Sequence, residues 1–200
     1  HLEVGDRVIV SKFTYGYSRY SLPLNLGLML PRSQHRLFEG LPRRGDVVVF
    51  IHPFSGDVMI KRAIGLPGDT IEMRGGALWI NDEAVATTEP QMFMRERYGE
   101  GREMARRSEE TLPDGYTHAI HDVIPDADLD EFGPFVVPED HVFFMGDNRD
   151  RSADSRWDGM GPVPIENLIG RADVVYATRS CGRDRTVSCP MDRWMKPLHH

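Results

Sequence analysis

The sequence GDVMIKRAIGLPGD, from Gly56 to Asp69, holds an apolar run that ends in a tight turn. Apolar residues bounded by turn residues are typical of a buried strand. Lys61 stands in the middle of this run. Burying an ammonium group is costly, so such a lysine pairs with an acid, extends its head group to solvent or loses its proton. A neutral lysine can act as a base, whereas a cation that flanks a core strand with its head in solvent has only a structural role.

Short apolar runs between turn residues recur on both sides of this lysine strand. Residues 47–51 are rich in β-branched side chains, and we expect them to pair with the lysine strand through the turn at 52–57. A second hairpin is predicted for 70–74 and 77–80, because Gly75-Gly76 separates them. The 14 prolines and 19 glycines favour short strands. The predicted fold is mainly β with little helix, with an alternating strand near 7–13 and a last strand near 169–176.

Composition indicates a globular protein and disfavours one class of partner. The chain has 200 residues, 40% hydrophobic and 28% charged, which is enough for one core domain with an insert. The net charge of −7 argues against binding to nucleic acid, which a basic surplus favours. Periodicity weakens and charges become dense at 83–134. We therefore predict a discontinuous catalytic core from 1–82 and 135–180, an inserted subdomain at 83–134 and a C-terminal extension at 181–200.

The segment from Gly146 to Gly159 is the second dense stretch, with four Asp, three Arg, one Asn and two Ser. It follows a hydrophobic strand, and one interpretation is a solvated loop. Alternatively, its Asp and Arg side chains lock one another by bidentate hydrogen bonds and form a rigid polar wall beside a site. Ser152 could then exchange a hydrogen bond with a neighbouring lysine amine.

Together these stretches resemble the sequence boxes of bacterial type I signal peptidases. The similar boxes are GDRVIVSK at 5–12, RGDVVVF at 44–50, IKRAIGLPGD at 60–69, GDNRD at 146–150 and SADSR at 152–156, in the same order and spacing. The resemblance covers most of the chain outside 83–134. It implies antiparallel sheets in a barrel or sandwich core with a small β-rich inserted cap. It also implies a serine endopeptidase with a Ser-Lys dyad and no cofactor or metal.

The resemblance also implies a role for individual residues. Lys61 matches the general base, and Ser152 matches the serine that orients it. The matched supporting network is Asp147, Arg149, Asp154, Arg156 and Arg62. The matched substrate-binding strand is Asp57, Val58, Met59 and Ile60. Apolar neighbours of Lys61 would lower its pKa, so we expect it to be neutral at working pH.

The nucleophile of the family lies in a Ser-Met box just before a Leu-x-x-Gly-Asp segment. Here that segment is 2–6 and only His1 precedes it, so we expect the serine upstream of residue 1 and no cleavage by these 200 residues alone. The family acts on signal peptides of exported preproteins, with its catalytic domain on the outer, periplasmic face of the cytoplasmic membrane and an N-terminal anchor. The apolar stretch from Leu22 to Pro31 is a candidate contact with the lipid surface, or else a loop that covers the core.

Weaker features leave alternatives open. His118, His121 and Asp122 could ligate a metal on a helix, but a surface loop is the favoured interpretation. Trp157 and Trp194 are expected to be packing anchors, and Cys181 and Cys189 form either a disulfide or two free thiols. Two other functions compete with the signal peptidase: a self-cleaving Ser-Lys protease of the repressor type, and a non-catalytic module that captures extended peptides by strand addition.

Overall fold

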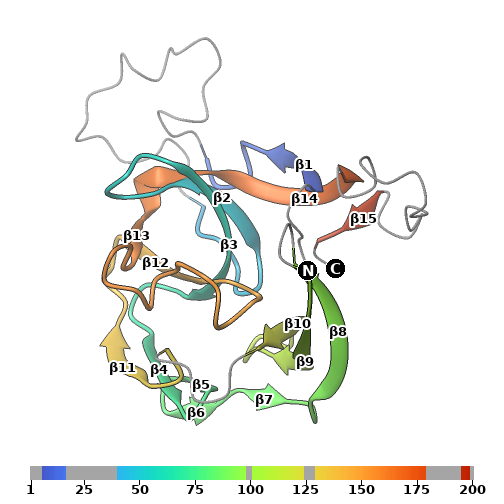
Figure 1. The fold of residues 1–200 in the computed structure, drawn as a ribbon. Helices are drawn as coiled ribbons and strands as arrows, with labels where there is room; N and C mark the ends of the chain where they lie inside the picture. Colours follow the sequence, from blue (N-terminus) through green and yellow to red (C-terminus); the bar gives the residue numbers. More distant parts are fainter. Residues whose placement is uncertain (1–5, 17–39, 98–100, 124–128, 179–194, 199–200) are drawn as a thin grey trace.

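The computed structural model describes residues 6–16, 40–97, 101–123, 129–178 and 195–198 (Figure 1). These residues form antiparallel strands, and the one helical element among them is the 3₁₀ turn η2 (Ile165–Asn167). The prediction of a mainly β fold with little helix is confirmed. No helix in the described ranges is both long enough and apolar enough to cross a membrane.

A seven-stranded sheet occupies the upper part of Figure 1 and carries Lys61 on its β3 strand. Its order is β1-β14-β2-β3-β12-β13, with β15 paired to β14. The strands are β1 (Asp6–Ser11), β2 (Val47–Ile51), β3 (Val58–Gly65), β12 (His141–Met145), β13 (Val163–Pro164), β14 (Leu168–Thr178) and β15 (Lys196–Pro197).

Two four-stranded sheets lie below the large sheet in Figure 1. One contains β4 (Thr70–Arg74), β5 (Ala77–Ile80), β6 (Glu83–Ala84) and β11 (Phe132–Val136). The other contains β7 (Ala86–Thr87), β8 (Gln91–Arg97), β9 (Gly101–Thr111) and β10 (Thr117–Asp122). The sheet of β7 to β10, called the third sheet from here on, is built entirely from the predicted insert at 83–134. The strands at the two ends of that insert, β6 and β11, instead pair with β5 and β4 of the other sheet. The division into domains stays a prediction.

Both predicted hairpins are present. Val48 lies opposite Lys61 in the β2–β3 pair. In the β4–β5 pair the connecting Gly75 and Gly76 have φ of 56° and 79°, a left-handed conformation that glycine adopts without steric cost.

The large sheet is buried on both faces where β2, β3 and β12 meet. Ala63 packs in one hydrophobic cluster with Phe50 and Phe144, whose rings stack with centroids 4.6 Å apart. Ile64, the next residue, packs in another cluster with Phe143 on the opposite face. Strands that are covered on both sides read as continuous apolar runs, which is the pattern of β2 and β12 in the sequence.

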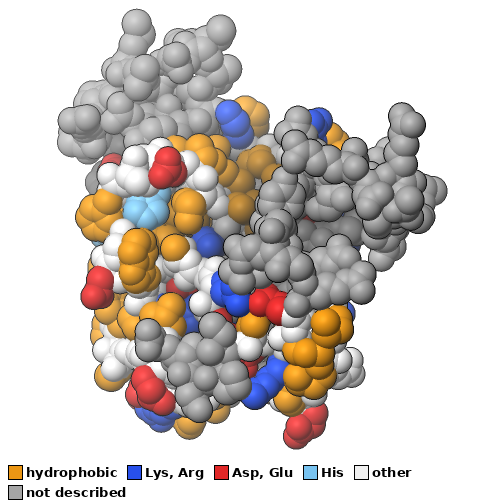
Figure 2. All heavy atoms as spheres, viewed as in Figure 1, with side chains coloured by type: hydrophobic (Ala, Val, Ile, Leu, Met, Phe, Trp, Pro, Cys, Tyr) orange, Lys and Arg blue, Asp and Glu red, His pale blue; other side chains and the backbone are white. Residues whose placement is uncertain are grey.

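Hydrophobic side chains remain exposed at two places on the face shown in Figure 2. They gather over the β2 and β3 region and over β8. The exposed residues include Val58 on β3, and Met92 and Met94 on β8. Val58 is 66% exposed, although it begins the strand that carries Lys61.

Two expectations about side chains are wrong. His118 and His121 lie on strand β10, not on a helix or a surface loop, and both are buried. Three positions apart on a strand, they point to opposite faces, so both faces of β10 are covered at these positions. Trp157 is 51% exposed and is not a core anchor, because it belongs to a surface turn in which its ring covers Gly159. The Leu22 to Pro31 stretch, the two cysteines and Trp194 lie outside the described residues.

Candidate active site

Lys61 and Ser152 meet at the centre of the candidate site. The Nζ atom of Lys61 lies 2.7 Å from Oγ of Ser152, within hydrogen-bond distance. Lys61 comes from β3 and is partly buried, whereas Ser152 comes from the loop that follows β12 and is buried. The β3–β12 pair, in which Met145 lies opposite Arg62, brings this loop beside the lysine.

The surroundings of Lys61 favour its neutral form. Burial is the largest influence and lowers the pKa of Lys61, because a low-dielectric environment penalises the ammonium. The Arg156 charge lowers it further, while the Asp154 and Asp147 carboxylates act in the opposite direction. The net result is a pKa below the ordinary lysine value, in the direction that the sequence predicted.

Gly146 allows Ser152 to approach the backbone. A Cβ built on Gly146 would lie 2.5 Å from Cβ of Ser152 and would also collide with its hydroxyl. Gly146 does not have a left-handed φ, so a glycine is needed here for the room it leaves to Ser152 and not for its backbone conformation. The sequence pattern did not single out this glycine as part of the site.

Asp154 and Arg156 fix the end of the same loop. Nε and Nη2 of Arg156 donate to the two carboxylate oxygens of Asp154 at 3.0 and 2.9 Å, and both side chains are buried. Asp154 also accepts the backbone N–H of Gly146 at 3.0 Å. This ion pair therefore holds the two ends of the segment that contains Ser152.

Arg62, beside the lysine on β3, is held by four hydrogen bonds. Its Nε and Nη2 atoms each donate to Asp147 at 2.8 Å, and Nη1 donates to the carbonyl of Gly45 and the hydroxyl of Tyr116. Although burial opposes it, the Arg62 charge and hydrogen bonds lower the pKa of Asp147 to about 2. The pair stays charged and anchors β3 to the start of the loop.

Arg149 does not pair with an acid of its own loop. Its Nη1 and Nη2 atoms donate to Glu110 on β9 at 2.9 and 2.6 Å, and both partners are buried. The idea that the Asp and Arg residues of 146–159 lock one another holds for Asp154 and Arg156. Asp147 and Arg149 instead bond to partners outside the loop.

The sequence profile of the family described as signal peptidase, peptidase S26, matches residues 1–177. The chain belongs to the signal peptidase family, peptidase S26. It is 39% identical to the signal peptidase I of Rickettsia bellii and 40% identical to that of Rickettsia typhi. Each match spans 178 residues and 86% of this chain, but 59% and 65% of those relatives.

The resemblance stated from the sequence boxes is confirmed by these matches, which favour neither of the two competing functions. A crystal structure of a signal peptidase I from Enterococcus faecalis is also similar, with 27% sequence identity. The match covers 66% of this chain and 97% of that one, and its TM-score of 0.40 is too low to support a statement about shared fold.

The segment that resembles the substrate strand of signal peptidases has an open edge. From Val58 to Lys61, β3 pairs with β2 on one side, and its pairing with β12 on the other side starts only at Arg62. Among the described residues, no strand therefore occupies the second edge of this segment. Asp57 precedes the strand in the turn and accepts a hydrogen bond from the hydroxyl of Ser55 at 2.7 Å.

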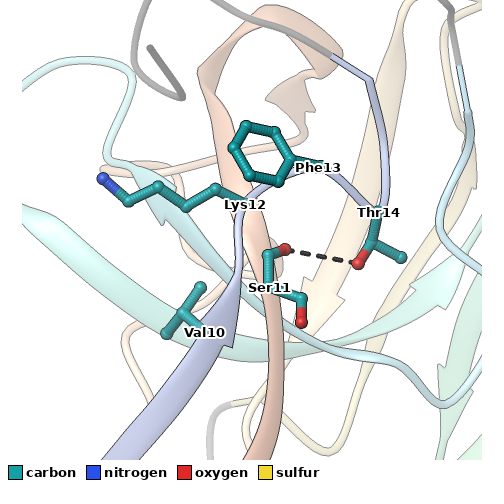
Figure 3. Close-up of a pocket in the computed structure, with 5 residues that line it drawn as sticks. All are labelled: Val10, Ser11, Lys12, Phe13 and Thr14. Carbon is teal, nitrogen blue, oxygen red and sulfur yellow. Dashed lines mark hydrogen bonds between the residues drawn. The ribbon is translucent and has the colours of Figure 1, made fainter. Parts of the chain in front are cut away.

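A pocket at the end of β1 is separate from the lysine pair. It is lined by Val10 to Thr14, and in Figure 3 the side chain of Lys12 points away from Ser11. The hydroxyl of Ser11 donates to the carboxylate of Asp173, so this serine is engaged elsewhere. Across the described ranges, no group of three or more His, Cys, Asp or Glu side chains is arranged to hold a metal ion.

Proposed function

We propose that this chain is the catalytic domain of a signal peptidase I, a serine endopeptidase that removes signal peptides from exported preproteins. The observation that carries the proposal is the Lys61 amine, partly buried in an apolar strand and 2.7 Å from the Ser152 hydroxyl. A serine hydroxyl is a weak nucleophile and needs a base. Burial lowers the pKa of Lys61, which makes its amine a better proton acceptor than an exposed lysine at the same pH.

In this proposal Lys61 accepts the proton of the nucleophilic serine as its oxygen attacks the scissile carbonyl. The protonated lysine then returns the proton to the leaving amine, and a water molecule that hydrolyses the acyl-enzyme is activated in the same way. Ser152 restrains the amine, and the Asp154–Arg156 pair restrains the segment that carries Ser152. In the family that the sequence boxes resemble, the nucleophile is the serine of a Ser-Met box.

The proposed substrate is an extended signal peptide with small side chains before the cut. The open edge of β3 from Val58 to Ile60 suits an added strand, because no described strand pairs with its backbone on that side. Val58, the first residue of β3 along this edge, is exposed. The proposed location is the outer face of the cytoplasmic membrane, with the insert as a cap beside the core.

The test uses the full-length protein and a preprotein whose cleavage is followed by a gel shift. Lys61→Met should lower kcat by a factor of about 10² to 10⁴, the usual contribution of a general base. The matched control is Lys196→Met, because Lys196 is exposed on β15. If Lys61→Met cleaves as fast as the control, Lys61 is not the base. If the unaltered protein binds signal peptides without cutting them, it is a binding module.

A further inference from the structure

The insert is attached to the loop that carries Ser152 at several points. His121 on β10 donates its backbone N–H to the carbonyl of Asp147 at 2.7 Å, and its carbonyl accepts the N–H of Arg149 at 2.9 Å. These bonds pair His121 in parallel with Asn148. The Glu110–Arg149 ion pair adds a side-chain link from β9. The stretch 147–149 is thus held by two strands of the third sheet.

The Glu110–Arg149 pair is a strong constraint because it is enclosed. The Glu110 side chain is 1% exposed and that of Arg149 is 5% exposed, so neither charge is hydrated if the other is removed. Two parallel N–H to oxygen bonds fix both the distance and the plane of the guanidinium. Nε2 of His118 lies 3.5 Å from the same carboxylate, but burial lowers the pKa of His118 to about 3, so it is neutral and does not replace Arg149.

Contacts lead from this pair to the lysine. The carbonyl of Arg149 accepts a hydrogen bond from Nη2 of Arg156, which also binds Asp154. Asp154 in turn accepts the N–H of Gly146, against which Ser152 packs. Ser152 then meets Nζ of Lys61. The Glu110 carboxylate bonds to Arg149 and lies beside His118, and it is not among the charges that act on Lys61, so its influence on Lys61 passes through the loop.

We propose that Glu110 is a positioning residue, through which the insert holds the 146–156 loop so that Ser152 stays against Lys61. This inference rests on the proposed function and gives the insert a role in it. A shift of the loop by about 1 Å would loosen the Lys61–Ser152 contact and admit water to the amine. Misplacement on that scale costs about 10²-fold in rate.

The experiment measures preprotein cleavage by the full-length protein carrying Glu110→Gln, a substitution of nearly the same shape. We expect kcat to fall by a factor of about 10 to 100 with KM changed less than about twofold. The acid limb of the pH–rate profile should also move to higher pH, because a hydrated Lys61 holds its proton more tightly. The matched control is Glu109→Gln, the exposed neighbour on the same strand, which should leave kcat and the profile unchanged.

A second variant separates positioning from fold stability. Glu110→Leu with Arg149→Met removes both buried charges, so it should recover the thermal midpoint that Glu110→Gln loses, as buried ion pairs often allow. The proposal predicts that kcat of this double variant stays low. It is overturned if the double variant regains both stability and kcat, or if Glu110→Gln cleaves like Glu109→Gln.

The outcomes also separate this inference from the function on which it rests. An inactive Lys61→Met beside a fully active Glu110→Gln removes only the role of Glu110. A fully active Lys61→Met removes the proposed base, and the role of Glu110 with it.

Discussion

The Ser152 hydroxyl lies 2.7 Å from the Lys61 amine, although 91 positions separate the two residues in the chain. The contact exists because β12 pairs with β3 and the loop after β12 folds back beside the lysine. Lys61 thus stands in an apolar strand, and its amine bonds to the Ser152 hydroxyl. The carboxylates of Asp154 and Asp147 act on it only as nearby charges.

Gly146→Ala should disable the site without unfolding the protein. The added methyl group would collide with Ser152, whereas the backbone at Gly146 suits an alanine. We expect kcat to fall by about 10² as Ser152 is displaced. Cleavage kinetics and thermal unfolding measure the two effects. Adding Ser152→Ala to Gly146→Ala should lower kcat little further, because the effects of substitutions at two residues in contact are not additive. If instead the double variant loses kcat by the product of the two single losses, this explanation is contradicted.

His118 should make the protein less stable in acid. Burial and the charges of Arg62 and Arg149 lower its pKa to about 3, against an unfolded value of about 6.5, while Asp147 opposes this shift. The unfolded chain binds the extra proton, so stability falls as pH drops from about 6.5 towards 3, by at most about 1.4 kcal/mol per unit.

His118→Phe removes this contribution and keeps a ring beside Tyr116. The unaltered protein should therefore lose stability relative to the variant as the pH falls. Any advantage in unfolding free energy that it has at neutral pH should shrink or reverse. Asp122, whose pKa is raised to about 6 chiefly by burial, acts in the opposite direction but is present in both proteins. Urea unfolding at several pH values measures the difference, and parallel curves would exclude the role of His118.

His52 should be replaceable by asparagine but not by phenylalanine. Its Nδ1 atom accepts the N–H groups of Phe54 at 3.2 Å and Ser55 at 3.1 Å, which closes the turn between β2 and β3. An asparagine oxygen in the same place accepts similar bonds. We expect His52→Phe to lose about 1–3 kcal/mol of unfolding free energy for two bonds, and His52→Asn to lose less than about 1 kcal/mol. Equal losses would show that these bonds do not stabilise the turn.

Local sequence patterns predicted the strands around Lys61 because their signals are short-range. The turn at 52–57 and the Gly75-Gly76 pair each lie between apolar runs, and they define the β2–β3 and β4–β5 hairpins. The residue types alone suggested that Ser152 could bond to a lysine amine, but the pairing with Lys61 in particular was predicted only through the family resemblance. Spacing alone says nothing about two residues that distant in the chain.

The role proposed for Glu110 of the insert could not be predicted from the sequence. Glu110 stands in a charge-dense region, and nothing in its neighbours distinguishes it from the exposed Glu109. Its burial follows from its place opposite His118 in the β9–β10 pair and from the approach of Arg149, which is 39 residues away. The same reason explains the misjudged His118: the sequence predicted a loop where tertiary packing makes a buried strand.

The protonation state of Lys61 is the central claim, and NMR titration of its side chain measures that state directly. The full-length protein with the Lys61 Nζ resonance assigned would be titrated from neutral pH across the alkaline range. The proposed base requires that Lys61 loses its proton well below the ordinary lysine value, because burial lowers its pKa. Titration of Lys61 near the ordinary lysine value of about 10.4 would contradict the account.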